Sequence, residues 1–273
     1  MINPPAETPP KSLPSNGSAS LKGTAFDLTG QTALITGGGT GLGLAMAQCL
    51  ATAGARVVLV GRRPEELAKA CAQIGPTAFA LPGDVTRLED APSLVERAEA
   101  QAGPITLLIN NAGVHLKKAA TETTDVEFAA VLQTHVFGAF AITREAGKRM
   151  VARGAGSVLF TASMTSLIGL SAVVAYSAAK SAYVGLVRSL ATEWGPHGIR
   201  VNALAPGWIA SDMLAKVLDG DPARREKILS RTPLGRLGDP TDIGWAAVYL
   251  ASPAARFVTG VVLPVDGGAA GGF

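Results

Sequence analysis

The chain has 273 residues, of which 48% are hydrophobic, and this length and composition suit one large core. Its formal net charge is +3, and the lysines and arginines are scattered along the chain, which gives no support for nucleic-acid binding. Apolar runs are short and interrupted by Gly, Pro and charged residues, so none approaches the about 18 to 20 residues that a membrane span needs. We therefore expect neither a membrane segment nor a nucleic-acid partner.

Residues 1–25 are rich in Pro and Ser and contain few large apolar side chains. Such a segment cannot offset the entropy cost of ordering, so we predict a disordered tail there and a single domain over residues 26–273. The segment resembles neither a signal peptide nor a transit peptide. Cys49 and Cys71 lie far apart and outside any metal-binding spacing. We expect reduced cysteines and a cytoplasmic location.

From residue 26 onward, apolar runs typical of strands alternate with stretches typical of helices. The predicted strands are residues 31–36, 56–60, 78–81, 106–110, 157–163, 199–205 and 260–265. The predicted helices are residues 41–53, 65–73, 88–102, 125–151, 175–194 and 241–250, with a polar substrate lid at about 207–234. Right-handed crossovers place such helices on both faces of a parallel sheet. The predicted fold is α/β, a doubly wound (Rossmann) seven-stranded parallel sheet with helices on both faces, in a single domain.

A glycine-rich turn joins the first strand to the first helix in TALITGGGTGLGLAMA. Gly37, Gly41 and Gly43 lack side chains where the backbone can approach a pyrophosphate at a helix N-terminus. Glycines at such a turn also serve tight packing alone, so this pattern leaves both interpretations open. Its spacing, Gly-x-x-x-Gly-x-Gly, differs from the commonest dinucleotide fingerprint, Gly-x-Gly-x-x-Gly.

The glycine spacing resembles that of the short-chain dehydrogenase/reductase family, and further motifs follow in the family's order. They are Asp84-Val85, Asn110-Asn111-Ala112-Gly113, Pro206-Gly207 and the closing VLPVDGG, so the resemblance covers residues 26 to about 268. It implies a nicotinamide cofactor whose adenine amino group meets Asp84 and whose nicotinamide amide meets the loop after Gly207. The cofactor-binding residues that it implies are Gly37, Thr40, Gly41, Leu42, Gly43, Asp84, Val85, Asn111, Ala112, Gly113, Tyr176, Lys180, Pro206, Gly207, Ile209 and Ser211.

The end of the second strand, VVLVGRR, bears on the choice between NAD and NADP. An acidic side chain there would bond the ribose 2′-hydroxyl of NAD, but Gly61 stands in its place. Arg62 and Arg63 follow, and a planar guanidinium suits a phosphate dianion. NADP is therefore favoured. NAD stays an alternative, because either arginine can be a solvated surface charge and Thr40 stands where many NADP-preferring relatives have a basic residue.

Tyr176 and Lys180 lie four residues apart, on one face of a predicted helix, and Ser163 lies thirteen residues before the tyrosine. A nearby cation favours tyrosinate, so Lys180 together with the positively charged oxidised nicotinamide is expected to lower the pKa of Tyr176. The spacing of the three matches the family's. The resemblance implies that Ser163 bonds the substrate oxygen, that Tyr176 transfers its proton and that Lys180 holds the nicotinamide ribose. The histidines stand at positions 115, 135 and 197, in unrelated settings, so no metal site is predicted.

One position departs from the family's pattern. Many relatives carry an Asn in Asn-x-x-Gly that holds a water on a proton path, whereas THVFG places His135 three residues before Gly138. The imidazole can pack, hold the water or exchange protons itself. We favour packing or water-holding and keep His135 among the catalytic candidates.

Within the family, the chain resembles sugar-acid and polyol dehydrogenases such as gluconate 5-dehydrogenases, and 3-oxoacyl-carrier-protein reductases. The predicted activity is NADP(H)-dependent interconversion of a ketone and a secondary alcohol, on a sugar acid, a polyol or a small ketone. A carrier-protein reductase is the alternative; its basic docking patch would consist of Arg144, Lys148, Arg149 and Arg153, which also fit an ordinary solvated face. A non-catalytic NADP-binding redox sensor is a third interpretation, although it would be expected to lack the tyrosine or the lysine. The resemblance also implies a homotetramer that pairs helices 125–151 and 175–194.

Overall fold

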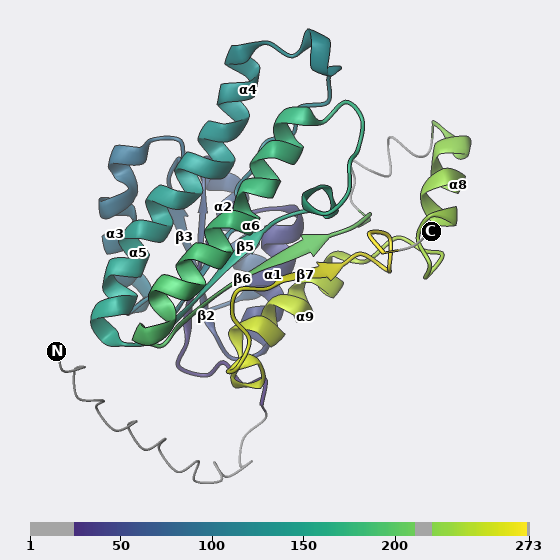
Figure 1. The fold of residues 1–273 in the computed structure, drawn as a ribbon. Helices are drawn as coiled ribbons and strands as arrows, with labels where there is room; N and C mark the ends of the chain where they lie inside the picture. Colours follow the sequence, from purple (N-terminus) through teal and green to yellow (C-terminus); the bar gives the residue numbers. More distant parts are fainter. Residues whose placement is uncertain (1–24, 211–219, 272–273) are drawn as a thin grey trace, which may run out of the picture.

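The computed structural model describes residues 25–210 and 220–271. The predicted tail, apart from residue 25, lies outside the described residues, as do part of the predicted lid and Ser211. The rest of the chain forms one parallel sheet with helices on both faces (Figure 1).

The central sheet has seven parallel strands in the order β3-β2-β1-β4-β5-β6-β7, which confirms the predicted fold class. The strands are β1 Thr32–Thr36, β2 Arg56–Gly61, β3 Ala78–Pro82, β4 Leu107–Asn110, β5 Gly156–Thr161, β6 Ile199–Pro206 and β7 Val262–Val265. The strand order reverses between β1 and β4, where Ile35 of β1 pairs with Leu59 on one side and Ile109 on the other. Such a reversal opens a crevice beyond the carboxyl ends of the strands, where ligands of open α/β sheets bind.

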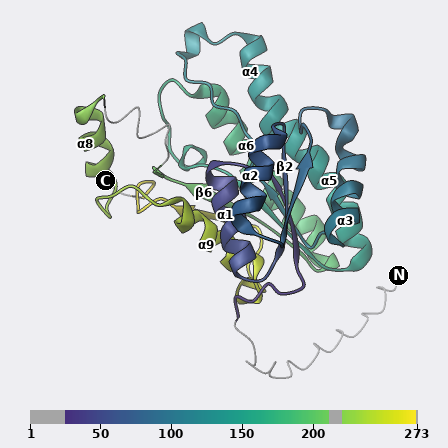
Figure 2. The same ribbon diagram turned by 180° about the vertical axis from the view of Figure 1, so that it is seen from behind.

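Helices cover both faces of the sheet. One face carries α1 (Gly41–Thr52), α2 (Pro64–Ile74) and α9 (Pro240–Ala251), of which α1 and α2 lie in front of the sheet in Figure 2. The other face carries α3 (Ala91–Ala102), α4 (Asp125–Leu132), α5 (Ala139–Arg153) and α6 (Val174–Trp194). A further helix, α8 (Pro222–Ser230), lies beside the carboxyl ends of β6 and β7 (Figure 1).

Alternate strand residues supply the two halves of the core. Leu34 and Val58 pack toward α3, α5 and α6, whereas Ile35 and Leu59 pack toward α1, α2 and α9. All four side chains are fully buried, and each contributes about 1.5–3 kcal/mol relative to an exposed position. Burial of the strands on both faces explains their continuous apolar sequences.

The long helix predicted over residues 125–151 is interrupted in the structure. A π-helical segment, Gln133–Gly138, joins α4 to α5, and π-helical turns inside α-helices often mark functional sites. Within this segment, the carbonyl of His135 accepts a hydrogen bond of 2.7 Å from the Tyr183 hydroxyl. A side chain at Gly138 would come within 2.6 Å of the Val85 carbonyl oxygen, so the segment also packs closely on the loop after β3.

The helical stretch Asp125–Arg153 is also the one stretch of the described residues that is long and apolar enough to cross a membrane. The core helix of a folded domain passes the same test. Ile142 and Met150 of this stretch are buried in the core against the sheet.

Candidate active site

Two pockets adjoin beyond the carboxyl ends of the strands. The smaller, of about 270 Å³, lies over β1, β2 and β4, and the larger, of about 1040 Å³, lies between the ends of β5 and β6 and helix α8. The loop after β4 borders both, because Gly113 and Val114 line the smaller pocket and His115 lines the larger. The two pockets thus lie in the crevice that the reversal of strand order opens.

The glycine-rich turn after β1 forms one wall of the smaller pocket through Gly37 and Thr40. Gly37 has a φ of +66°, and a Cβ there would lie 2.9 Å from the Cα of Ala112. A Cβ at Gly43 would overlap the carbonyl oxygen of Gly37. Gly43 therefore serves the close packing of the turn on α1, and neither it nor its predicted companions Gly41 and Leu42 line the pocket.

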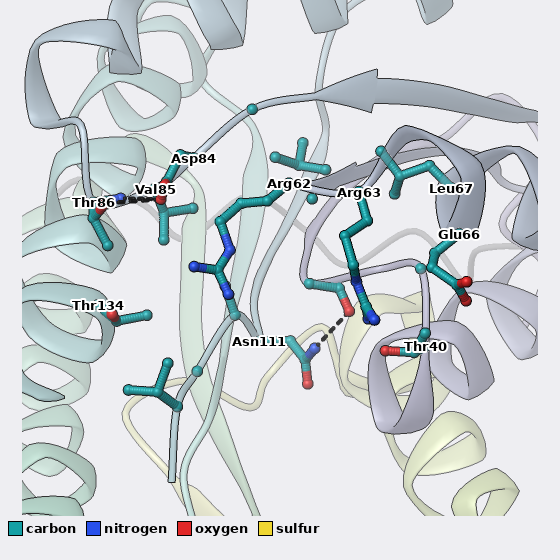
Figure 3. Close-up of a pocket in the computed structure, with 18 residues that line it drawn as sticks. Thr40, Arg62, Arg63, Glu66, Leu67, Asp84, Val85, Thr86, Asn111 and Thr134 are labelled. Carbon is teal, nitrogen blue, oxygen red and sulfur yellow. Dashed lines mark hydrogen bonds between the residues drawn. The ribbon is translucent and has the colours of Figure 1, made fainter. Parts of the chain in front are cut away.

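Asn111 ties the end of β4 to the glycine-rich turn. Its backbone N–H donates to the Thr36 hydroxyl (3.0 Å), and its side-chain amide donates to the carbonyls of Thr36 and Gly37 (3.2 Å each). The last of these bonds is drawn in Figure 3. Together with Ala112, Gly113 and Val85, this residue lines the smaller pocket as the sequence predicts.

Arg62 and Arg63 enter the smaller pocket from the end of β2. Arg62 reaches toward Asn111 from the side of Asp84, and Arg63 lies toward Thr40 and Glu66 (Figure 3). Within residues 25–210 and 220–271, neither arginine forms an ion pair. The pocket therefore presents two guanidinium groups that no carboxylate contacts at ion-pair distance in the described part of the chain, although the charge of Arg62 acts on Asp84.

Asp84 stands at the same pocket and accepts hydrogen bonds from the backbone and hydroxyl of Thr86, at 2.9 and 2.8 Å through Oδ1. Burial acts to raise the pKa of its carboxyl, but these bonds and the charges of Arg62 and Arg87 outweigh it and leave the pKa below its usual value. Glu66, Leu67, Thr86 and Thr134 line the pocket as well, although no sequence motif marks them. Their contribution depends on how α2 and the π-helical segment fold back, and no local motif marks it.

Ser163, Tyr176 and Lys180 meet at the larger pocket. Ser163 follows β5, and its hydroxyl accepts the backbone N–H of Thr165 at 3.1 Å. Tyr176 lies in the first turn of α6 and lines the pocket with Ser163. The Lys180 ammonium lies one turn further on, buried behind the tyrosine, where it donates to the Thr161 carbonyl and stands 5.5 Å from the centre of the Tyr176 ring.

Burial acts against the lowering of the pKa of Tyr176 that is expected from Lys180 together with the oxidised nicotinamide. Burial raises the pKa of the phenol, although the nearby Ser163 hydroxyl opposes the rise. Burial also lowers the pKa of Lys180 to about 7, so near neutrality this side chain is only partly charged. The physical reason is shared desolvation, which penalises phenolate and ammonium alike.

His135 is buried beside these residues, with its ring 5.5 Å from that of Tyr176 and 1% of its surface exposed. Its Nε2 lies 3.0 Å from the Val114 nitrogen, whose N–H it can accept, and 2.8 Å from the Val114 oxygen. A side chain at Gly113 would overlap the imidazole. His135 therefore braces the loop that borders both pockets.

The sequence model described as "Enoyl-(Acyl carrier protein) reductase" matches residues 37–270. The chain is 42% identical over 248 residues to a galactitol 2-dehydrogenase (L-tagatose-forming) from Cereibacter sphaeroides, covering 90% of this chain and 97% of the relative. It is 37% identical to the gluconate 5-dehydrogenase of Gluconobacter oxydans, covering 89% and 96%. Among solved structures, a gluconate 5-dehydrogenase from Burkholderia cenocepacia in complex with NADP and tartrate matches with a TM-score of 0.87 and 32% identity, covering 91% and 98%.

The chain belongs to the short-chain dehydrogenase/reductase family. It is thus an oxidoreductase, and sugar-acid and polyol dehydrogenases of this family are among the relatives of the chain. The resemblance inferred from its motifs is confirmed.

Two neighbouring carboxylates, Glu145 and Glu99, offset half of the charge of the four basic residues considered as a carrier-protein docking patch. Arg144 and Lys148 both contact Glu145, at 2.8 and 2.9 Å. Arg149 and Arg153 both contact Glu99, at 2.9 and 3.0 Å. An acidic partner would therefore meet four α5 cations that already form ion pairs.

The segment after β6 contributes unevenly to the site. Gly207, whose N–H donates to the Val265 carbonyl (3.1 Å), and Trp208 line the larger pocket. Pro206 ends β6, and Ile209 forms a bridge with Gly238 and faces a neighbouring pocket under Trp208 and Leu234. The larger pocket also has three cations that no sequence motif marks, Lys117, Lys227 and Arg231. His115, likewise unmarked, lines the same pocket with its ring 5.0 Å from that of Tyr176.

The structure predicts that His135 does not titrate during turnover. Burial and the charge of Lys180 lower the pKa of its imidazole to about 3, so the ring stays neutral above that pH. We expect the rate profile of the wild type to show no ionisation near 6.5 from this residue, and His135→Asn to keep most activity with an unchanged profile. An ionisation near 6.5 that disappears in the variant would instead make His135 a proton carrier.

Stability should respond to His135 in the acid range. The unfolded chain protonates an imidazole below about 6.5, whereas the folded chain does not until the pH nears 3. The unfolded state therefore binds more protons in this window, and the free energy of unfolding falls as the pH falls from 6.5 toward 3. Denaturant titrations across this range should show a smaller fall for His135→Asn than for the wild type.

Proposed function

We propose that the chain interconverts a secondary alcohol and a ketone on a sugar acid or a polyol, with NADP(H) as its cofactor. The observation that carries the proposal is the junction of the two pockets, where Ser163 and Tyr176 line one and the unpaired Arg62 and Arg63 line the other. The names of the relatives support the substrate class, and the NADP of the Burkholderia cenocepacia structure supports the cofactor.

The residues of the smaller pocket fit NADP. A 2′-phosphate needs cationic donors, and Arg62 and Arg63 offer guanidinium groups that form no ion pair in the described part of the chain. The turn at Gly37 has no room for a side chain and presents backbone to a pyrophosphate. We assign Asp84 to the adenine amino group, Thr40 to the phosphates and Lys180 to the nicotinamide ribose.

The protein's own part in the reaction is to hold the substrate oxygen and move one proton. The Ser163 hydroxyl donates to that oxygen, and the Tyr176 hydroxyl gives its proton to the forming alkoxide or takes it from the alcohol. When bound, the cofactor supplies or accepts the hydride. The partly charged Lys180 ammonium behind the phenol stabilises the phenolate left after proton donation.

Two other functions receive less support. A carrier-protein reductase would need a docking surface for an acidic partner, but the four basic residues considered for it are paired with Glu99 and Glu145. A redox sensor without turnover would not need Ser163, Tyr176 and Lys180 to converge on one pocket.

A substrate panel tests the proposed function. NADPH oxidation should be observed with keto-sugar acids or keto-sugars, and NADP reduction with the matching alcohols. Turnover should be far lower with a 3-oxoacyl thioester. Preference for the thioester would replace the proposal with the reductase alternative, and absence of turnover across the panel would remove it.

We also propose a cytoplasmic homotetramer that pairs the faces of α5 and α6. Exposed apolar side chains on the helical segment that ends in α5, Phe137 and Phe140, support such an interface. A monomer mass in light scattering would contradict this assembly.

A further inference from the structure

The larger pocket carries charge of one sign. Among its described lining residues, three are cationic, Lys117, Lys227 and Arg231, and none is acidic. All three side chains are exposed to solvent. A cleft lined by one sign of charge concentrates ligands of the opposite sign.

Lys117 differs from its neighbour Lys118 in what it contacts. The Lys118 ammonium is held by both carboxylate oxygens of Glu127 at 2.9 Å, and its backbone N–H donates to the Ala172 carbonyl at 2.8 Å. These contacts fix the backbone at the rim of the pocket. Lys117 has no ion pair within the described chain, and its charge lies close enough to help lower the pKa of His115, whose ring is 5.0 Å from that of Tyr176.

The other two cations come from the opposite rim. Lys227 and Arg231 lie one helical turn apart at the end of α8, which Figure 1 shows beside the carboxyl ends of β6 and β7. Ile228 and Thr232 anchor this turn, because both are buried and the Thr232 hydroxyl donates to the Ile228 carbonyl at 2.9 Å. Within residues 25–210 and 220–271, neither Lys227 nor Arg231 forms an ion pair.

In the described part of the chain, exposed cations without an ion pair occur elsewhere too, as at Arg188 and Arg256. What distinguishes the pocket is that three cations line one cavity with no acidic residue among its described lining residues. Lys118 is paired with Glu127, and Arg236 with Asp242 at 3.4 Å. A neutral polyol would leave the three cations of the pocket without a counter-ion, whereas a carboxylate would accept charged hydrogen bonds from them.

We infer that the larger pocket selects substrates with a carboxylate at the end of the chain away from the reacting carbon, and that Lys117 and Arg231 bind this carboxylate. The inference rests on the proposed function and decides within it between sugar acids and neutral polyols. It sets the chain apart in substrate charge from the galactitol dehydrogenase to which it is 42% identical, since galactitol is uncharged.

Binding measurements on the NADPH-loaded enzyme, in which the alcohol probes cannot be oxidised, test the inference without relying on turnover. The probes are D-gluconate, glucitol and glucitol 6-phosphate, which share a six-carbon hydroxylated chain and differ in the end group. In calorimetric titrations at low salt, gluconate should bind at least about tenfold more tightly than glucitol, the size of one charged hydrogen bond. This advantage should shrink as salt screens the exposed charges.

The double variant Lys117→Gln, Arg231→Gln assigns the effect to these residues. It should lose at least about tenfold in gluconate affinity while glucitol and NADPH affinities stay near their wild-type values. The control, Lys148→Gln with Arg256→Gln, removes the same charge from α5 and from the amino edge of the sheet, and should change none of the three.

Each outcome decides a separate question. Equal or absent binding of gluconate and glucitol overturns the inference, as does a double variant that loses NADPH affinity in step with gluconate. Tighter binding of the phosphate ester than of gluconate overturns the choice of a carboxylate. Selective gluconate binding without turnover on any keto-sugar acid would refute the proposed function and leave the charge selection intact.

Discussion

Tyr176→Phe is expected to lower turnover by at least about a hundredfold, because removal of a positioned proton carrier forfeits the 10²–10⁴-fold that general acid–base catalysis supplies. The aromatic ring stays, so its packing against His115 and His135 should persist, and so should the NADPH affinity. Steady-state rates and NADPH titrations on the same preparation would measure both quantities.

Tyr183→Phe is the matched control for this experiment. It removes a phenol hydroxyl from the same helix, two turns away, where the hydroxyl donates to the His135 carbonyl and does not line the pocket. Turnover of the control should change far less than that of Tyr176→Phe. Near wild-type turnover of Tyr176→Phe would show that another group carries the proton.

Arg62→Gln combined with Arg63→Gln should weaken NADPH relative to NADH by at least about tenfold. A charged hydrogen bond contributes about 1.5–3 kcal/mol, and only NADPH carries the phosphate that these side chains would bind. NADH affinity should change little. The ratio of the two dissociation constants, from fluorescence titrations, is the quantity to compare.

Arg87→Gln controls for the loss of charge alone. Arg87 is near enough to lower the pKa of Asp84, as Arg62 does, but it does not line the smaller pocket. The control should leave the ratio of the dissociation constants unchanged. A parallel loss of NADPH and NADH affinity in the arginine double variant would show that these residues do not bind the 2′-phosphate.

The strands and most helices follow from local signals in the sequence. Apolar runs predict β1 to β7 within a few residues, because a strand that is buried on both faces has a continuous apolar sequence. The interruption of the predicted helix at Gln133 was not foreseen. At this interruption the His135 carbonyl bonds the hydroxyl of Tyr183, 48 residues away in the sequence. Local periodicity does not predict such a long-range contact.

The site was predictable where family motifs carry it and obscure where tertiary structure assembles it. Ser163, Tyr176, Arg62 and Arg63 were found because spacing or position marks them. The cations of the larger pocket come from two distant segments, and nothing near Lys117 in the sequence separates it from the ion-paired Lys118. The effect of burial on the pKa of Tyr176 is absent from the sequence for a related reason, since it depends on the finished fold.

The loop from Asn111 to His115 has a consequence for interpreting kinetic data. It is clamped to the glycine-rich turn at Asn111, held by the imidazole of His135 at Val114, and ends against Tyr176 at His115. Five successive residues thus form a wall shared by the two pockets, and we expect a displacement on one side to disturb the other. Substitutions that loosen this wall should raise the KM values for cofactor and substrate together. A substitution at a residue that contacts only one ligand should raise one of the two.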